Sequence, residues 1–161
     1  MRFYLLDRVT ALVPGKSIEG LKAWTLSEEY FEQHFPLFPV VPGVLQIESM
    51  AQMMGVLFER TLAKEFPLAE GLHRASILSI VHKAKFKDFV RPGDQVRLLG
   101  VPTTYDRMSG TAQVKCYVGD GLVAEAELQF RFLETSNDQR RMASWAEHAE
   151  RYHSVILGDL G

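Results

Sequence analysis

Residues 34–52, HFPLFPVVPGVLQIESMAQ, contain the side chains of this chain with the clearest chemical potential. His34 comes first, and Glu48 follows it on the far side of three prolines. A neutral imidazole accepts a proton near pH 7, and a carboxyl group can donate one when its surroundings keep it protonated. The pair therefore predicts general acid–base chemistry.

The Pro42-Gly43 step predicts the start of a helix and a binding site for an oxygen that gains negative charge. The first backbone N–H groups of a helix lack internal acceptors, proline suits a helix start, and glycine lets a ligand approach the backbone. The N–H of Gly43 or Val44 would then point at a carbonyl oxygen. The helix dipole favours negative charge there, as an enolate or oxyanion requires.

Glu48 and Gln52 are four positions apart, so they share one face of the expected helix. Taken singly, a loop histidine, a helix glutamate and a Pro-Gly turn each have an ordinary structural explanation. Their combination at these spacings favours a catalytic site.

A long helix and a series of strands must position these residues. Apolar residues recur at helical spacing from Val44 to Phe66, where Gly55 is the only glycine or proline. Strands are predicted at 9–13 and 18–26, on either side of the turn at 14–16, and at 76–90, 95–104, 110–118 and 122–133. Ser27 is expected to cap a short helix through Glu28 and Glu29. A sheet that curls around the long helix gives an α+β domain.

The segment from residue 136 to 161 differs from the rest, and we treat it as a tail that follows a domain of residues 1–135. Apolar side chains at spacings of three and four predict a C-terminal amphipathic helix. They are Met142, Trp145, Ala149, Tyr152 and Ile156.

Composition limits the class of protein. With 161 residues, 47% apolar and 24% charged, the chain fits one globular core. A net charge of −2 gives no cationic surplus for binding nucleic acid. The N-terminal apolar run ends at Asp7, too early for a signal peptide, and no stretch approaches membrane-spanning length, so we expect a soluble cytoplasmic protein. Cys116 alternates with Val114 and Val118, which predicts a buried strand side chain.

The stretch from His34 to Gln52 resembles the signature of the β-hydroxyacyl-acyl carrier protein dehydratases of bacterial fatty-acid synthesis, which is close to H-F-P-G-x-P-x-x-P-G-V-L-x-x-E-A-M-A-Q. A second block, from Lys83 to the turn Arg91-Pro92-Gly93-Asp94, is similar to a strand and turn of that family. The likeness covers most of residues 5–133. It implies the hotdog fold, an antiparallel sheet wrapped around a long central helix. It also implies a homodimer in which the histidine of one subunit faces the carboxylate of the other, and leaves larger oligomers open.

The resemblance implies a role for each motif residue. His34 matches the histidine that takes the α-proton of a 3-hydroxyacyl thioester, and Glu48 matches the acid that helps the β-hydroxyl leave as water. Gly43, preceded by Pro42, matches the glycine whose N–H polarises the thioester carbonyl. Gln52 matches the amide that supports the acid. No metal or organic cofactor is implied, and a glutamate at position 48 resembles the branch that does not isomerise the product.

Two residues depart from the family pattern. Leu37 replaces the usual glycine, and Phe38 replaces a commonly polar residue, which predicts a bulkier loop and a reshaped tunnel mouth. We therefore compare three functions: a dehydratase, a hotdog thioesterase that uses a helix carboxylate and water, and a non-catalytic acyl-binding partner subunit. His34 within its proline frame favours elimination.

The substrate implied by the resemblance is carried by acyl carrier protein or coenzyme A. Lys83, Lys85 and Lys87 alternate onto one strand face, and Arg91 follows. The row is either a docking site for acidic acyl carrier protein or a solvated strand face. No metal site is expected, because the remaining histidines lack paired ligand spacing. These are His73, His82, His148 and His153.

Overall fold

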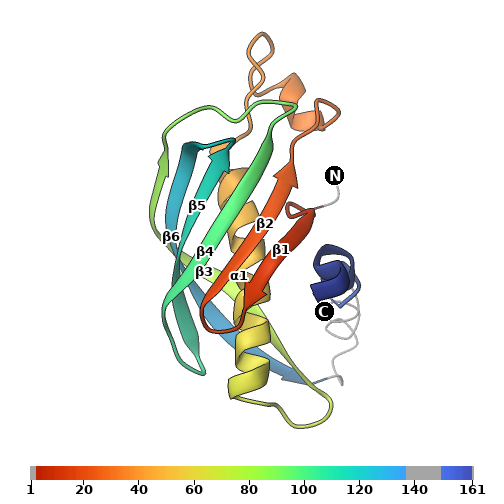
Figure 1. Ribbon diagram of the computed structural model, residues 1–161, viewed down its shortest axis with the longest axis vertical. Helices are drawn as coiled ribbons and strands as arrows, with labels where there is room; N and C mark the ends of the chain where they lie inside the picture. Colours follow the sequence, from red (N-terminus) through yellow and green to blue (C-terminus); the bar gives the residue numbers. More distant parts are fainter. Residues whose placement is uncertain (1–2, 137–149, 161) are drawn as a thin grey trace.

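The computed structural model describes residues 3–136 and 150–160, and it consists of a curved antiparallel sheet and one long helix (Figure 1). The six strands are β1 (Arg8–Val13), β2 (Ser17–Ala23), β3 (Leu72–Phe86), β4 (Gln95–Tyr105), β5 (Ser109–Val118) and β6 (Gly121–Ser136). They lie in the order β1-β2-β4-β5-β6-β3. The predicted α+β class is therefore confirmed.

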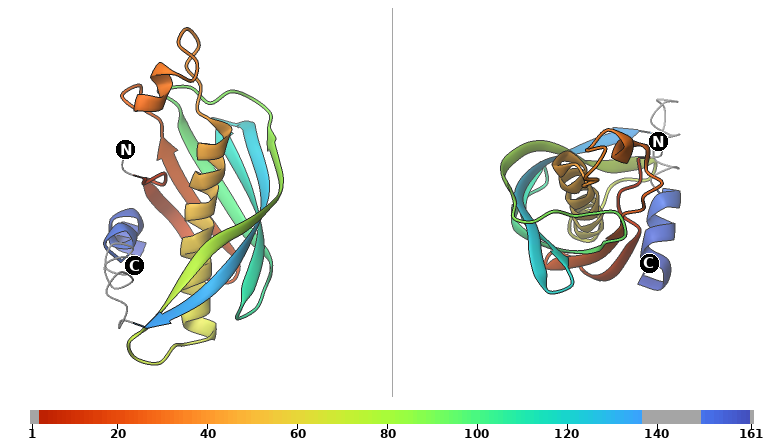
Figure 2. Two further views of the ribbon diagram at one scale, coloured as in Figure 1. Left: turned by 180° about the vertical axis from the view of Figure 1, so that it is seen from behind. Right: turned by 90° about the horizontal axis from the view of Figure 1, so that it is seen from above.

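The helix α1 (Gly43–Glu65) lies in the concave side of the sheet, as the view from above shows (Figure 2). Its side chains pack into the core together with those of the strands, and Met50, Met53, Met54, Leu57, Phe58 and Leu62 are fully buried. The sheet approaches the helix closely where strand residues have no side chain. A Cβ atom at Gly110 would lie 2.8 Å from the ring of Phe58, and one at Gly100 would collide with Sδ of Met54.

The predicted elements agree with the structure closely, with three exceptions. The first is the strand predicted at 76–90, which lies four residues earlier, as β3 at Leu72–Phe86. The helix expected at 44–66 lies one residue earlier, at Gly43–Glu65. Cys116 is buried in β5 as predicted, and burial raises the pKa of its thiol to about 12. The predicted strand at 18–26 ends early at Ala23, because Trp24 turns to exchange backbone hydrogen bonds with the 91–94 turn.

The third exception is the predicted cap at Ser27, which was wrong. The short helix is a 3-10 turn, η1 (Glu29–Glu32), preceded by Glu28 without a side-chain cap. The backbone N–H of Ser27 donates instead to Oγ1 of Thr25 at 3.3 Å. This local turn uses the residue that the sequence assigned to the helix.

Residues 150–157 are helical and lead into η2 (Gly158–Leu160), alongside β1 (Figures 1 and 2). Ile156 and Leu157 are buried in the same core as α1. The end of the predicted amphipathic helix is therefore confirmed, while Met142, Trp145 and Ala149 lie outside the described residues. Across residues 3–136 and 150–160, no helix has the length and apolar character needed to span a membrane.

Candidate functional site

His34 lies in a tight loop between η1 and α1, held mainly by backbone hydrogen bonds. Its N–H donates to the carbonyl of Tyr30 at 2.9 Å, and the N–H of Val40 donates to the carbonyl of His34 at 3.1 Å. The imidazole Nδ1 lies 2.9 Å from the carbonyl oxygen of Val40. Because a carbonyl oxygen only accepts, Nδ1 must carry the hydrogen, and Nε2 keeps the lone pair of a base.

Leu37 and Phe38, the two departures from the family pattern, occupy different environments in this loop. The Phe38 ring packs edge-on against Phe89 at 5.3 Å, and the Arg91 guanidinium lies 4.8 Å from its centre. Leu37 is 99% exposed. Phe38 therefore anchors the loop to the segment after β3, while Leu37 leaves a fully exposed apolar side chain at its tip.

The start of α1 presents free backbone donors, as its sequence predicts. Pro42 caps the helix, and the first N–H to donate back is that of Leu45, to the Pro42 carbonyl at 3.0 Å. The N–H groups of Gly43 and Val44 consequently have no acceptor inside the helix. Space here is tight, because a Cβ atom at Gly43 would lie 2.7 Å from the ring of Phe86.

Glu48 and Gln52 share a helix face and contact each other. Nε2 of Gln52 donates to Oε1 of Glu48 at 3.0 Å and to the carbonyl of Phe3 at 3.0 Å. Oε1 of Gln52 accepts the N–H of Leu5 at 2.8 Å. The amide is thus oriented with its NH₂ group toward Glu48, and it contacts Oε1 of that carboxyl group.

Glu48 and Gln52 line a cavity of about 1070 Å³ on one side of α1. Its walls come from α1, from β3 and β6, from the N-terminal segment and from the helix at 150–157. The lining residues include Phe3, Tyr4, Glu48, Gln52, Gly55, Val56, Glu59, Ser76, Ile77, Leu78, Phe130, Tyr152, His153 and Ile156. Most of this surface is apolar, which suits an acyl chain.

Glu59 is a residue of this cavity that the sequence interpretation missed. Burial raises the pKa of its carboxyl to about 7, against a smaller opposing effect of the hydrogen bond from the N–H of Ser76 at 3.0 Å. Nε2 of His153 lies 3.8 Å from Oε2 of Glu59. Spacings of four, seven and eleven from Glu48 place Gln52, Gly55 and Glu59 on one helix face, and this spacing was the available signal.

The structure does not place His34 in the wall of this cavity within one chain. His34, Gly43 and Val44 are all absent from the residues that line it, whereas Glu48 and Gln52 are present. The loop that carries His34 lies beyond the first turn of α1 (Figure 1). Within a single chain, Glu48 therefore lines this cavity and His34 does not.

The positive charge of the row formed by Lys83, Lys85, Lys87 and Arg91 is partly neutralised. Lys85 and Lys87 both approach Oε1 of Glu125, at 3.9 and 3.4 Å, so two cations share one carboxylate. Lys83 is exposed at the register position opposite Glu127. Arg91, held over Phe38, extends the positive surface toward the His34 loop.

The described histidines do not form a metal site. No cluster of three His, Cys, Asp or Glu side chains with metal-binding geometry occurs in residues 3–136 and 150–160. Nε2 of His82 contacts Oε1 of Gln129 at 2.8 Å, and His148 lies outside the described residues.

Sequence comparisons identify a family over most of the chain. The FabA-like domain family matches residues 1–127. The 3-hydroxyacyl-[acyl-carrier-protein] dehydratase FabZ of Clostridioides difficile is 35% identical over 132 residues, which cover 82% of this chain and 88% of the relative. The FabZ proteins of Alkalilimnicola ehrlichii and Wolinella succinogenes are 41% and 42% identical. The aligned regions cover 78% and 79% of this chain, and 78% and 83% of the two relatives.

Solved structures agree with the fold. The dehydratase heterocomplex ApeI:P from Xenorhabdus doucetiae superposes with a TM-score of 0.63 at 14% identity, over 80% of this chain and 82% of that chain. A hot-dog-like protein from Thermanaerovibrio acidaminovorans gives a TM-score of 0.59 at 18% identity, over 84% of this chain and 93% of that chain. At such identities the similarity shows the fold alone, and it confirms the expected hotdog fold.

Proposed function

We propose, because this chain belongs to the FabA-like domain family, that it is a 3-hydroxyacyl-[acyl-carrier-protein] dehydratase of fatty-acid biosynthesis. The observation that carries the proposal is its identity of 35–42% to FabZ dehydratases over about four fifths of the chain. The reaction removes water from a 3-hydroxyacyl thioester and gives a trans-2-enoyl thioester. As such an enzyme it would act in the cytoplasm.

The chemistry assigns one step to each polar group. Nε2 of His34 removes the α-proton, and the electrons of the C–H bond become the new double bond. The N–H groups of Gly43 and Val44, at the positive end of α1, stabilise the negative charge that builds on the thioester oxygen. Oε2 of Glu48 gives its proton to the β-hydroxyl as the C–O bond breaks, and water leaves. Return of the proton from His34 to Glu48 restores the site without a cofactor.

The site is complete only when two copies of the chain meet, and we propose a homodimer. β3 pairs with β6 on one side only, although it spans fifteen residues at the end of the sheet. Ile77, Ile80 and Val81 on this strand are each more than 40% exposed. A long edge strand with exposed apolar side chains favours pairing with another strand. Pairing of two copies of β3 would supply His34 of one subunit to Glu48 of the other.

The carrier is proposed to dock on the positive surface made by Lys83, Lys85, Lys87 and Arg91. This surface continues into the His34 loop through the contact between Arg91 and Phe38, so a carrier bound there would lie beside the base. Since Glu125 offsets part of the charge, we expect the row to increase the rate of encounter more than the affinity.

Incubation with a trans-2-enoyl thioester tests the function, because the enzyme must catalyse hydration as the reverse reaction. Hydration by the wild-type chain, lost in His34→Ala and in Glu48→Gln, is the expected result. Release of free thiol without hydration would identify a thioesterase instead. Acyl binding with neither activity would identify a non-catalytic partner subunit.

A further inference from the structure

We propose that the helix at residues 150–157 is part of the catalytic site and that its Tyr152 is a positioning residue for Glu48, acting through Gln52. This inference rests on the dehydratase function proposed above. It assigns a role to a segment that lies beyond the FabA-like match, which ends at residue 127.

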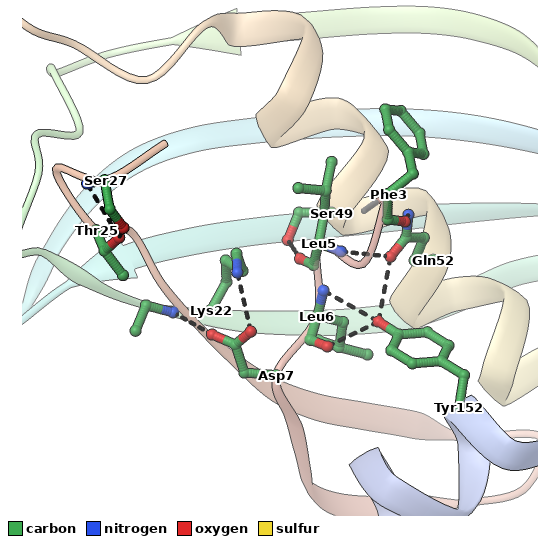
Figure 3. A network of polar contacts seen from close by, with 11 residues as sticks. Phe3, Leu5, Leu6, Asp7, Lys22, Thr25, Ser27, Ser49, Gln52 and Tyr152 are labelled. Carbon is green, nitrogen blue, oxygen red and sulfur yellow. Dashed lines mark hydrogen bonds and ion pairs between the residues drawn. The ribbon is translucent and has the colours of Figure 1, made fainter. Parts of the chain in front are cut away.

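Tyr152 reaches across from the C-terminal helix to the N-terminal segment and to α1 (Figure 3). Its hydroxyl accepts the N–H of Leu6 at 3.1 Å and has two acceptors for its single hydrogen. These are the carbonyl of Leu6 at 2.7 Å and Oε1 of Gln52 at 3.2 Å. The ring stacks on Tyr4, with centroids 4.5 Å apart and planes at 20°. The side chain is therefore fixed at both its ring and its hydroxyl.

The side-chain amide of Gln52 connects Tyr152 to Glu48. Oε1 of Gln52 lies between the hydroxyl of Tyr152 and the N–H of Leu5, while Nε2 donates to Glu48. The N–H of Leu5 and the hydrogen of the Tyr152 hydroxyl, which is shared with the Leu6 carbonyl, both reach this oxygen and restrict the rotation of the amide. This rotation determines where its NH₂ group holds the carboxyl. Loss of the Tyr152 hydroxyl removes one of the two.

The hydroxyl of Tyr152 stays protonated near neutral pH. Burial is the main cause that raises the pKa of Tyr152 far above its usual range, and the negative charge of Asp7 contributes in the same direction. Tyr152 consequently remains a donor wherever the acid is active.

The helix is anchored by contacts that are independent of the hydroxyl. Ile156 and Leu157 are 1% and 3% exposed and belong to the main core. Tyr152, His153 and Ile156 also form part of the cavity wall that contains Glu48. The C-terminal segment thus closes one side of the cavity and orients the acid at the same time.

A purely structural role is the competing explanation, since Tyr152 also ties down the backbone of Leu6. The two roles differ in what they change. A positioning role affects the turnover step and depends on Gln52, whereas a structural role affects folding stability and does not.

Tyr152→Phe, which keeps the ring and removes the hydroxyl, tests the proposal by enoyl-thioester hydration. We expect kcat to fall about ten-fold while KM changes less than about two-fold, since a small displacement of a catalytic group is costly. In a Gln52→Ala background the same substitution should change kcat less than about two-fold. Ser154→Ala is the matched control on this helix, because the Ser154 hydroxyl donates to the carbonyl of Arg151, one turn back on the same helix, and not to Gln52 or Glu48.

Leu157→Ala gives a second test if Tyr152→Phe fails to fold. It loosens the anchor of the helix without altering the cavity wall, and kcat should fall again. Two results with an active wild-type chain would overturn this inference and leave the proposed function standing. One is a Tyr152→Phe variant that keeps its kcat, and the other is a fall in kcat that is equal with and without Gln52. A wild-type chain without hydration activity would overturn the proposed function and this inference together.

Discussion

The roles proposed for His34 and Glu48 depend on which of their atoms are already occupied by neighbours. The Val40 carbonyl occupies Nδ1 of the imidazole, and Gln52 occupies Oε1 of the carboxyl. The sequence predicts the two residue types and the pairing of Glu48 with Gln52, because four positions on a helix always share a face. It does not predict the contact with Val40, which depends on how the proline-rich loop closes.

Glu59 shows the limit of motif-based reasoning at this scale. It belongs to no recognisable signature, and its interest comes from burial beside Ser76 and His153, which lie far away in the sequence. Burial, with a smaller effect of Arg60, also lowers the pKa of His153. At pH 8 this histidine is neutral and cannot offset an ionised Glu59.

Glu59→Gln should stabilise the protein at alkaline pH. The folded chain raises the pKa of Glu59 from 4.5 to about 7, so its stabilising contribution is complete below about pH 4.5 and is lost as the pH rises through 7. Glutamine at position 59 carries no charge, so the variant does not lose this stability as the pH rises. The difference in the free energy of unfolding is at most about 3 kcal/mol. Thermal unfolding should show a higher Tm for the variant at pH 8 and a small difference near pH 4.5.

Glu70→Gln, at an exposed position in the connection between α1 and β3, is the control for this measurement. Its Tm difference from wild type should stay flat across the same pH range. A Glu59→Gln variant that gains nothing at pH 8 would show that the carboxylate is not penalised by burial.

At the scale of elements, local periodicity was sufficient to predict α1 and every strand of the sheet. The early end of the strand predicted at 18–26 depends on a contact between distant segments, the pairing of Trp24 with the 91–94 turn. The missing cap at Ser27 instead reflects a local turn with Thr25. The C-terminal helix was also predicted, but the acceptors of Tyr152 lie 100 and 146 positions away, so its hydroxyl could not be linked to Glu48. The division of the chain at residue 135 stays a prediction.

Gly43→Ala should destabilise the protein and reduce activity. Its new methyl group would lie 2.7 Å from the Phe86 ring, and such overpacking costs about 1–3 kcal/mol. The shift needed to relieve it would also move the N–H groups that we propose bind the thioester oxygen. Denaturant unfolding and kcat measure the two effects, and Phe86→Ala in the same chain should restore stability in part.

Gly55→Ala is the matched substitution in the same helix for the stability measurement. The nearest atom to its new methyl group is Cβ of Ser76 at 3.8 Å, which is an ordinary contact. Alanine should therefore stabilise the helix here, by up to about 1 kcal/mol. Equal effects of alanine at both glycines would contradict the steric role of Gly43.

At the scale of the whole molecule, the exposed edge of β3 is the feature that favours pairing with a strand of a second chain. The sequence predicted the strand but gave no sign that it lies at the edge, because strand order depends on long-range pairing. The homodimer was expected from the resemblance to a dimeric family, and the position of β3 at the end of the order β1-β2-β4-β5-β6-β3 supports the proposed dimer.

Ile80→Lys should prevent dimerisation and abolish hydration activity. Ile80 is 45% exposed on the edge strand, and charged side chains on an edge oppose strand pairing. Sedimentation velocity should show a monomer for this variant. Val101→Lys is the control, because Val101 is 46% exposed on an interior strand of the same sheet and should leave the dimer and the activity intact. A dimeric Ile80→Lys would place the interface elsewhere.

Complementation between inactive variants tests the shared site most directly. His34→Ala and Glu48→Ala are mixed, unfolded and refolded together, so that half of the dimers contain one chain of each. One of the two sites in such a mixed dimer receives an intact His34 and an intact Glu48, and hydration should recover to about a quarter of the wild-type rate. If each site lay within a single chain, every site in the mixture would lack one residue. Activity that stays at the level of the separate variants would contradict the account.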